Sequence, residues 1–448
     1  MQIPFGEWLP DQPEYLNPGA NTANNVYFAA QSYKRFPSLV NYSSNNMGAD
    51  SRGAGSFRDN SNTVFNFVAN NTDIYQLDGG TFTSRKSSLT GGNTDFWTFT
   101  QFGNYVIASN GVDAPQYYLM GTSTNFANLS AIATSGTVPI FRVSGVVRDF
   151  LVTGNHSTAS NKIQWSGIND ITTWAAGTKQ SDSQELPGSG GEIVHITSGE
   201  IAYVFRQNQI IRMDYVGGAT VFRLSVISPN RGAVYGRTVC QDNRRVFFYA
   251  DDGFFEVNGD QVISIGAEKV NRFFDLDLNK AYTDRICAAV DPFNQLALWL
   301  YPSKSNTANT TGICDKIIIY NYATQKWSTA DASASTIFSQ FVGAYTVELM
   351  DIISENLDNI NIALDTDFWS GGQLYLGAID SDYKAAIFSG TENEGTIETR
   401  ELELFPGHRS SITNVRPIVD ATSTVTIKSR ERLADNVTES SSSSMVTS

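Results

Sequence analysis

The stretch TVCQDNRRVFFYADDGFFEVNGDQVISI, residues 238–265, decides the fold of this chain. It contains four short apolar runs, and turn-forming residues separate them, with Asp-Asp-Gly at 251–253 and Asn-Gly at 258–259. Asn-Gly supplies the positive φ that tight hairpin turns need. Four short strands joined by tight turns predict an antiparallel meander, which is how one blade of a β-propeller looks in sequence.

Similar strand-turn-strand patterns recur along the chain at a spacing of about 45 residues. The equivalent second strands are expected to begin near residues 64, 105, 150, 203, 246 and 296. Insertions in loops explain the unequal steps, because loop length costs little free energy. Residues 336–390 contain further strand-like runs that would complete a last blade. The sequence therefore predicts an all-β protein, a propeller of about six four-stranded blades, with any count from five to seven compatible with the pattern.

Two flanking segments differ from the repeats. Residues 1–50 are rich in Pro and aromatic residues and predict an extended arm lying on a surface, because Pro fixes φ and restricts its predecessor. Residues 391–448 contain alternating polar and apolar stretches, Thr396–Thr399 and Glu401–Leu404, which predict half-buried strands before a mobile Ser-rich end. The expected organisation is an N-terminal arm (1–50), a propeller (51–390) and a small C-terminal β unit (391–448). One short helix is expected around Glu268–Phe274.

The composition excludes several classes of function. Charged residues make up only 17% of the chain, and the formal net charge is −14. Affinity for nucleic-acid phosphates comes from Lys and Arg, and no basic tract is present, so stable nucleic-acid binding is not expected. The first residues lack the features of a secretory signal, and no apolar run is long enough to span a bilayer. We expect a protein made in a cytoplasm, without a membrane span.

No catalytic or metal-binding motif stands out. Neither the histidines nor the cysteines have the spacing of a metal site, and the cysteines are expected to be small buried side chains. These residues are His156, His195, His408, Cys240, Cys287 and Cys314. The chain also lacks a nucleophile elbow and a phosphate-binding loop. We therefore expect no enzyme activity, no cofactor and no structural metal, and assign no catalytic residue.

Paired carboxylates are the main enzymatic alternative, because glycoside hydrolysis needs two carboxylates that face one cleft and propellers host many unrelated activities. The candidate pairs are Asp251 with Asp252, Asp275 with Asp277, and Asp365 with Asp367. The first pair is better explained as a hairpin turn, and the last resembles only the start of a calcium loop. A carbohydrate-binding or glycoside-hydrolysing propeller stays open as the alternative function.

Three regions of the chain carry a family resemblance. The first contains Trp8-Leu9-Pro10-Asp11-Gln12-Pro13, Asn17-Pro18-Gly19, Asn25-Val26-Tyr27 and Phe36-Pro37-Ser38-Leu39. The second is Ser228–Gly236 with the Phe-Phe-rich blade that follows, through Gly266–Phe274. The third is Ile397–Asp420, with Gly407-His408-Arg409 and Val415-Arg416-Pro417. In this order, with a propeller between them, the chain resembles the tail nozzle proteins of short-tailed bacteriophages, also called packaged-DNA stabilisation proteins or tail tubular proteins B.

The resemblance implies a structural virion protein. Six copies would form a ring below the portal and adaptor, and this channel would retain packaged DNA and conduct it during ejection. The implied partners are further copies of the chain, the tail adaptor protein, tail fibres or spikes, a tail plug or needle, and double-stranded DNA in transient passage. The implied location is the tail of the virion, after synthesis in the host bacterial cytoplasm. A phage fibre or another scaffold protein stays open as a third interpretation, which the subunit count would separate because fibres are usually trimers.

Subunit contacts are expected in the arm and in the strands after residue 394, because both carry apolar residues without an obvious place in the ring. The candidate interface residues are Trp8, Pro10, Asp11, Phe36, Arg409 and Arg416.

Overall fold

The computed structural model describes most of the chain. The described residues are 3, 5–13, 17–218, 220–307, 311–342, 373–391, 393–405, 408, 411–420, 422–430, 435–440 and 443–445. The chain divides into two compact units, Met1–Thr399 and Arg400–Ser448. The larger unit contains both the propeller and the N-terminal arm, and it ends later in the chain than the boundary expected at residue 391.

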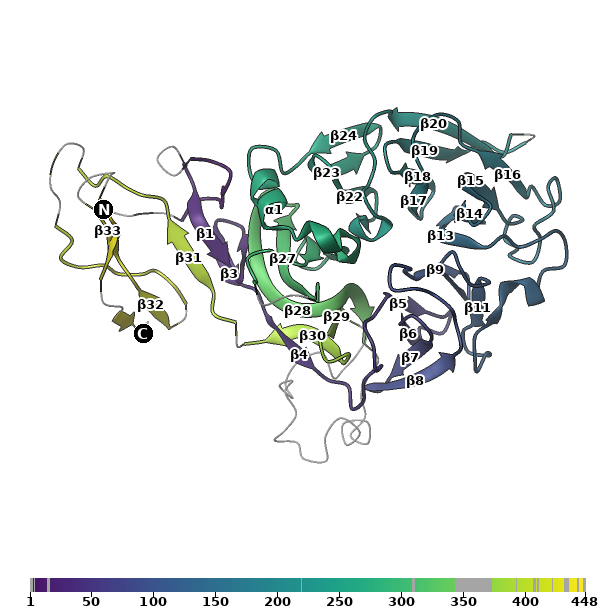
Figure 1. Ribbon diagram of the computed structural model, residues 1–448, viewed down its shortest axis with the longest axis horizontal. Helices are drawn as coiled ribbons and strands as arrows, with labels where there is room; N and C mark the ends of the chain where they lie inside the picture. Colours follow the sequence, from purple (N-terminus) through teal and green to yellow (C-terminus); the bar gives the residue numbers. More distant parts are fainter. Residues whose placement is uncertain are drawn as a thin grey trace. The chain divides into compact units, whose positions relative to one another are not determined.

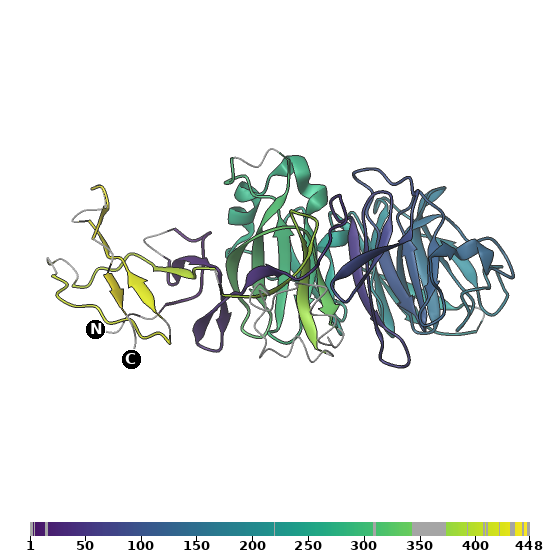
Figure 2. The same ribbon diagram turned by 90° about the horizontal axis from the view of Figure 1, so that it is seen from below.

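The larger unit is a ring of antiparallel β-sheets, which Figure 1 shows along the ring axis and Figure 2 from the side. The expected all-β propeller fold is thereby confirmed. Within the described residues, five of its sheets have four strands each. Their strands are β5 (Gly53–Arg58), β6 (Val64–Ala69), β7 (Ile74–Asp78), β8 (Thr81–Lys86), β9 (Thr98–Phe102), β10 (Tyr105–Ser109), β11 (Gln116–Leu119), β12 (Ala127–Asn128), β13 (Phe141–Val147), β14 (Phe150–His156), β15 (Ala159–Trp165), β16 (Asp182–Glu185), β17 (Ile193–Ile196), β18 (Ile201–Arg206), β19 (Ile210–Tyr215), β20 (Phe222–Ser228), β21 (Cys240–Asp242), β22 (Arg245–Ala250), β23 (Gly253–Asn258) and β24 (Gln261–Ser264).

A nine-stranded sheet completes the ring and joins two blades through one long strand. Its strands are β25 (Cys287–Asp291), β26 (Leu296–Tyr301), β27 (Cys314–Asn321), β28 (Lys326–Phe341), β29 (Leu374–Asp380), β30 (Ala385–Gly390), β4 (Ser38–Asn41), β1 (Ala20–Asn24) and β31 (Thr396–Thr399). The first half of β28 pairs with β27, and its second half pairs with β29, with Ala334 as the residue at which the pairing changes. β28 is therefore the last strand of one blade and the first strand of the next.

The ring closes where β28 lies beside β5. Thr336 Oγ1 donates a hydrogen bond to the carbonyl oxygen of Ser51 (3.3 Å), and the backbone N–H of Phe341 donates to Ser56 Oγ (2.8 Å). In the same blade, the N-terminal strand β4 pairs with β30. This blade thus combines strands from both sides of the propeller segment, and strand pairing closes the ring.

Side chains alternate between two cores along each inner strand. In β22, Val246 and Phe248 belong to the cluster shared with the preceding sheet, whereas Phe247 and Tyr249 belong to the cluster shared with the following sheet. Successive residues of a strand point to opposite faces, so a strand that is buried on both faces reads as a continuous apolar run. The turn after it contains Gly253 at φ 127°, a conformation that glycine adopts at little cost.

The hydrophobic core consists of clusters that lie between neighbouring sheets. The described residues form seven such clusters. In the largest, Phe254 packs against Trp299 and Trp327, with ring centroids 4.8 and 5.0 Å away. If each half of β28 is assigned to its own blade, the ring has seven blades, and one cluster lies between each pair of neighbouring blades. Seven is the upper end of the range expected from the sequence.

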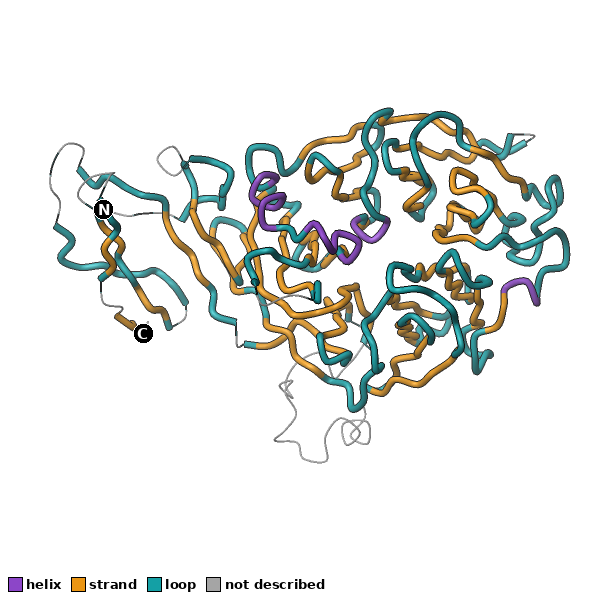
Figure 3. Tube along the Cα trace, viewed as in Figure 1, coloured by secondary structure: helices purple, strands orange, loops and turns teal. Residues whose placement is uncertain are grey.

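Helices are short and few within the described residues, as Figure 3 shows. They are α1 (Asn271–Asp277) and three 3-10 turns, η1 (Leu129–Ala131), η2 (Gly236–Thr238) and η3 (Lys280–Arg285). The helix expected around Glu268–Phe274 is therefore present and begins a few residues later. Phe274 of α1 packs between Tyr249 and Phe254, at 4.9 and 4.8 Å between ring centroids.

Within its described residues, the smaller unit contains two short two-stranded antiparallel sheets. β32 (Ser423–Val425) pairs with β35 (Ser443–Met445), and β33 (Lys428–Ser429) pairs with β34 (Thr438–Glu439). The prediction of a strand at Glu401–Leu404 is wrong, because these residues lie outside any strand. The neighbouring Thr396–Thr399, also predicted as a strand, forms β31. The difference has a physical reason, because an alternating stretch forms a stable strand only where it pairs with another strand. β31 pairs with β1.

Candidate functional site

Trp8 of the N-terminal arm is buried inside its own subunit. Its side chain is 3% exposed, and its ring packs edge-on against Phe273 of α1 at 5.0 Å between centroids. Its Nε1–H donates a hydrogen bond to the carbonyl oxygen of Asn21 at 3.1 Å. A buried Trp removes a large apolar area from water while its N–H keeps a partner. Trp8 therefore fastens the arm to the propeller.

Asp11 binds the beginning of α1. Its Oδ2 accepts a hydrogen bond from the backbone N–H of Arg272 (2.9 Å), and its Oδ1 accepts one from Phe273 (2.7 Å). Val270, which precedes the helix, makes no side-chain capping bond. Asp11 thus performs the role of an N-cap from a distant part of the chain, and its negative charge is favourable at this end of the helix.

Further polar contacts hold the turn that contains Pro10. Lys269 Nζ lies 2.7 Å from Glu7 Oε1, and the backbone N–H of Asp11 donates to the carbonyl oxygen of Lys269 at 3.1 Å. The hydroxyl of Tyr33 donates to the carbonyl oxygen of Gly6 at 2.7 Å. Burial, together with the nearby Glu7, raises the pKa of Tyr33, so the phenol remains a hydrogen-bond donor.

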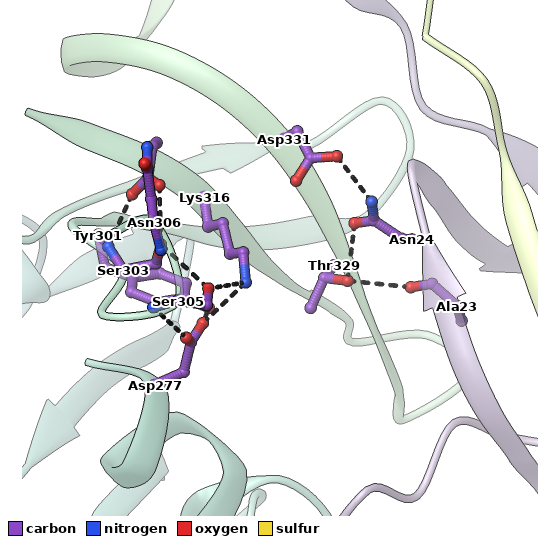
Figure 4. A network of polar contacts seen from close by, with 11 residues as sticks. Ala23, Asn24, Asp277, Tyr301, Ser303, Ser305, Asn306, Lys316, Thr329 and Asp331 are labelled. Carbon is purple, nitrogen blue, oxygen red and sulfur yellow. Dashed lines mark hydrogen bonds and ion pairs between the residues drawn. The ribbon is translucent and has the colours of Figure 1, made fainter. Parts of the chain in front are cut away.

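The arm is bound a second time through β1, which pairs in parallel with β28 (Figure 4). Asn24 Nδ2 and Asn25 Nδ2 both donate to Asp331 Oδ2, at 2.7 and 3.1 Å. Thr329 Oγ1 donates to the carbonyl oxygen of Ala23 at 3.1 Å. β1 also pairs with β31, so the arm lies between the last strand of one blade and the strand that ends the larger unit.

Phe36 lies at the third attachment of the arm, after the hairpin of β2 (Val26–Ala29) and β3 (Ser32–Arg35). Its side chain is 3% exposed, and its ring contacts Phe388 of β30 at 5.2 Å between centroids. The following strand, β4, extends the sheet of β30. Phe36 therefore packs into the core of the last blades.

These positions bear on the expected subunit contacts. We expected the arm at a subunit interface because its apolar residues had no obvious place in the ring. Trp8 and Phe36 are instead buried in the hydrophobic core of their own chain, between the arm and the sheets. Asp11 is likewise bound within the subunit. Arg416 is exposed in the smaller unit, and Arg409 lies outside the described residues.

A partly buried polar cluster lies where the end of α1 meets β26 and β27 (Figure 4). Asp277 Oδ2 accepts hydrogen bonds from the hydroxyl of Tyr301 (3.0 Å) and from Lys316 Nζ (3.0 Å). Lys316 Nζ also donates to Ser305 Oγ at 2.7 Å. Burial alone would raise the pKa of Asp277, but the contacts with Lys316, Ser305 and Tyr301 bring it below its ordinary value.

The composition of this cluster is close to that of a nucleophilic Ser–Lys dyad. Such a dyad needs a neutral amine that takes the proton of the serine hydroxyl. Lys316 instead forms an ion pair with Asp277, and Ser305 Oγ donates to Ser303 Oγ at 3.3 Å. The ion pair between Asp277 and Lys316 therefore joins α1 to the sheet and has a structural role.

Three of the candidate carboxylates from the sequence, Asp252, Asp275 and Asp277, take part in ion pairs. Asp252, in the turn after β22, binds Arg231 through both oxygens, with Arg231 Nε 3.1 and 3.0 Å from them. Asp275 lies 2.7 Å from Lys280. A glycosidase acid instead needs a carboxyl group that stays protonated. The pair Asp365 and Asp367 lies outside the described residues.

The two propeller histidines are held neutral. His156 is 3% exposed and its Nε2 lies 3.1 Å from Thr153 Oγ1. Burial lowers the pKa of His156, and that of His195, to about 4. His408 lies in the smaller unit and is exposed.

Cys240, Cys287 and Cys314 are all buried, as expected, and burial raises the pKa of each thiol. Among the residues that the structure describes, no group of three His, Cys, Asp or Glu side chains could hold a metal ion. In the same part of the chain, no helix has the length and apolar character needed to cross a bilayer.

Sequence reasoning missed the residues that receive the arm, namely Lys269, Arg272 and Phe273 on one side and Asp331 on the other. One signal was present. The helix expected there begins after Val270, which has no capping side chain, so an acceptor from elsewhere in the chain was required.

No family model matches the chain, and no curated protein matches it. Among solved structures, it is similar to the extracellular domain of a hybrid two-component system from B. thetaiotaomicron, at 13% identity over 79% of this chain, with a TM-score of 0.44. The match covers 40% of that longer chain. A chain of the mitotic checkpoint complex gives 10% identity, covering 82% of this chain and 99% of that chain, with a TM-score of 0.44. Apo AztD from Citrobacter koseri gives 13% identity, covering 62% and 86%, with a TM-score of 0.35.

Proposed function

We propose that this chain is a structural subunit of a short phage tail, in which copies assemble into a ring-shaped nozzle that retains packaged DNA and conducts it during ejection. The observation that carries the proposal is the built-in N-terminal arm. The segment with the resemblance, from Trp8 to Leu39, is bound to the propeller at α1, at β28 and at β30. Attachment of the arm at three places makes the subunit rigid, and a rigid subunit is suited to form the wall of the proposed channel.

The charge of the chain supports a conduit rather than a stable DNA-binding protein. The formal net charge is −14, and like charges repel the phosphates of DNA. In the channel that we propose, this repulsion limits adhesion while DNA passes. The ion pairs of Asp252 and Asp277 favour this role over glycoside hydrolysis, because they engage two of the carboxylates that the enzymatic alternative would use.

The smaller unit supports contacts between copies. Several of its large apolar side chains are strongly exposed, although the unit is short. These residues are Phe405 (65% exposed), Ile412 (48%), Ile418 (83%), Val419 (38%) and Val437 (51%). Exposed apolar groups of this size are typical of surfaces that a partner covers. We propose that a neighbouring copy covers them, while the adaptor, the fibres or spikes and a plug or needle bind elsewhere on the assembled tail.

Sedimentation of the purified full chain tests this proposal. We expect an assembled species of six copies, and we expect Phe405→Ser combined with Ile418→Ser to shift it toward the single chain. Phe293→Ser is the matched control, because Phe293 is 86% exposed but lies in the propeller. A wild-type chain that sediments only as a monomer at every concentration would contradict the proposal.

A further inference from the structure

Three arginines from different blades converge on one small hollow. Arg52 precedes β5, Arg237 lies in η2 before β21, and Arg285 precedes β25. The hollow is small and opens to solvent at its mouth. Its other lining residues are Asp50, Ser51, Gly312, Ile313, Cys314, Ser335 and Ser381. The site therefore lies where the first strands of several blades begin, next to the seam at which β28 passes from one blade to the next.

The arginines are positioned by contacts that hold them in place. Arg52 Nε donates to Asn71 Oδ1 at 3.0 Å, and Arg285 Nη1 donates to the carbonyl oxygen of Gly312 at 3.2 Å. Arg237 Nη2 donates to Thr336 Oγ1 at 2.9 Å. The ring of Phe96 orients two of them, since the guanidinium carbons of Arg237 and Arg52 lie 4.4 and 5.8 Å from its centroid.

The hollow carries more positive than negative charge. Asp50 is shared between Arg52 and Arg285, and its carboxylate lies 3.8 Å from each, beyond hydrogen-bond distance. Asp284 is the other carboxylate that acts on Arg52. Among the described residues that line the hollow, three guanidinium groups stand against one carboxylate, that of Asp50, in a protein whose net charge is strongly negative.

Burial makes this excess costly. The side chain of Arg52 is 6% exposed, and a buried charge without a matching partner is unfavourable. Burial lowers the pKa of Arg52, Asp50 raises it, and the neighbouring Arg285 and Arg237 lower it further. A bound anion would relieve both the desolvation and the repulsion. Each guanidinium has five N–H donors, and the hydrogen bonds within the described residues engage a minority of them.

We propose that this hollow binds a small oxyanion of the phosphate or sulfate type, held by Arg52, Arg237 and Arg285. Guanidinium groups match such oxygens in geometry and charge. The bound ion joins β5, η2 and β25 at the seam of the ring, and so stabilises the closed propeller. Its small size and enclosure by three blades favour a free ion over the backbone of a nucleic acid. This inference concerns the single chain and is independent of the proposed nozzle assembly.

Titration of the full chain with inorganic phosphate tests the site, with calorimetric binding and the midpoint of thermal unfolding as readouts. An ion that binds only the folded state gives a calorimetric binding signal that saturates, and it raises the unfolding midpoint further at each higher concentration. We expect saturable binding by the wild type and a dissociation constant raised about tenfold or more in Arg285→Gln, because a charge-assisted hydrogen bond is lost. Arg223→Gln is the control, since Arg223 is 64% exposed and pairs with Asp214 elsewhere. This control also measures the general stabilisation that phosphate gives to any folded protein.

A second variant separates binding from folding. Asp50→Asn removes the carboxylate that competes with the anion, so we expect tighter phosphate binding, an effect that a merely structural role would not produce. Equal phosphate responses in the wild type, Arg285→Gln and Arg223→Gln would overturn the proposal, as would weaker binding by Asp50→Asn. Displacement of phosphate from the wild type by a short DNA duplex would overturn the assignment to a small free ion.

Discussion

The carboxylate of Asp11 caps the helix that contains Phe273, with 2.7 Å between Oδ1 and a backbone nitrogen 262 positions further along the chain. Substitution by Ala leaves the N–H groups of Arg272 and Phe273 without this acceptor. We expect Asp11→Ala to lower the free energy of unfolding by about 1–2 kcal/mol, as for other capping residues. Urea unfolding measures the change. Glu200→Ala, at an exposed position of the propeller, serves as the control and should change stability little.

Trp8 anchors the same segment through burial. Its replacement by Ala leaves a cavity beside Phe273, and we expect a loss of about 3–5 kcal/mol, as for other buried aromatic residues. We also expect the arm to become the first site of limited proteolysis, because its local attachment is weakened. A Trp8→Ala chain with the stability and the protease resistance of the wild type would show that the arm does not depend on this anchor.

How far the sequence predicts this fold can be judged from particular strands. The turn residues around Gly253 and Asn258-Gly259 predict a meander, and the strands β22, β23 and β24 lie where expected. The count of blades was less certain because β28 serves two of them. Residues 328–336 are mainly Ser, Thr and Ala, with no Gly, Pro or Asn to mark a turn between blades. The boundary between these two blades therefore cannot be recognised from turn-forming residues.

The candidate site was harder to predict than the fold. The arm was recognised as a distinct segment, but its partners Phe273, Asp331 and Phe388 are hundreds of residues away, and local patterns do not report such pairings. The hollow of Arg52, Arg237 and Arg285 illustrates the same limit, because its arginines are isolated in sequence and only the ring brings them together.

The pair of Asp277 and Lys316 is expected to behave as one unit. Asp277→Asn removes the negative charge beside a largely buried ammonium group, and we expect a loss of about 1–3 kcal/mol at neutral pH. The folded state lowers the pKa of Asp277, so this contribution is present above the ordinary Asp range and is lost as pH falls through the folded-state pKa. The difference between the wild type and Asp277→Asn should therefore shrink in acid.

A double-mutant cycle with Lys316→Met provides the control for this prediction. Because the two side chains contact each other, the double variant should lose less stability than the sum of the single variants. Strict additivity would show that the ion pair contributes nothing as a pair.

The histidines give the propeller a dependence on mildly acidic pH. Their pKa falls from 6.5 to about 4 on folding, so the unfolded chain binds more protons between these values. The contribution of the neutral histidines to the free energy of unfolding is therefore fully present above the ordinary pKa. It is lost as pH falls from about 6.5 to about 4. We expect His156→Gln to remove part of this slope, about 1–3 kcal/mol across the interval. His408→Gln, at an exposed position of the smaller unit, is the comparison variant.

The central claim is that copies of this chain form a closed ring around a channel. Electron microscopy of the purified full chain tests it most directly, because class averages report both symmetry and the presence of an opening. We expect a sixfold annulus with a central opening. Single propellers without association, or an elongated trimer, would contradict it.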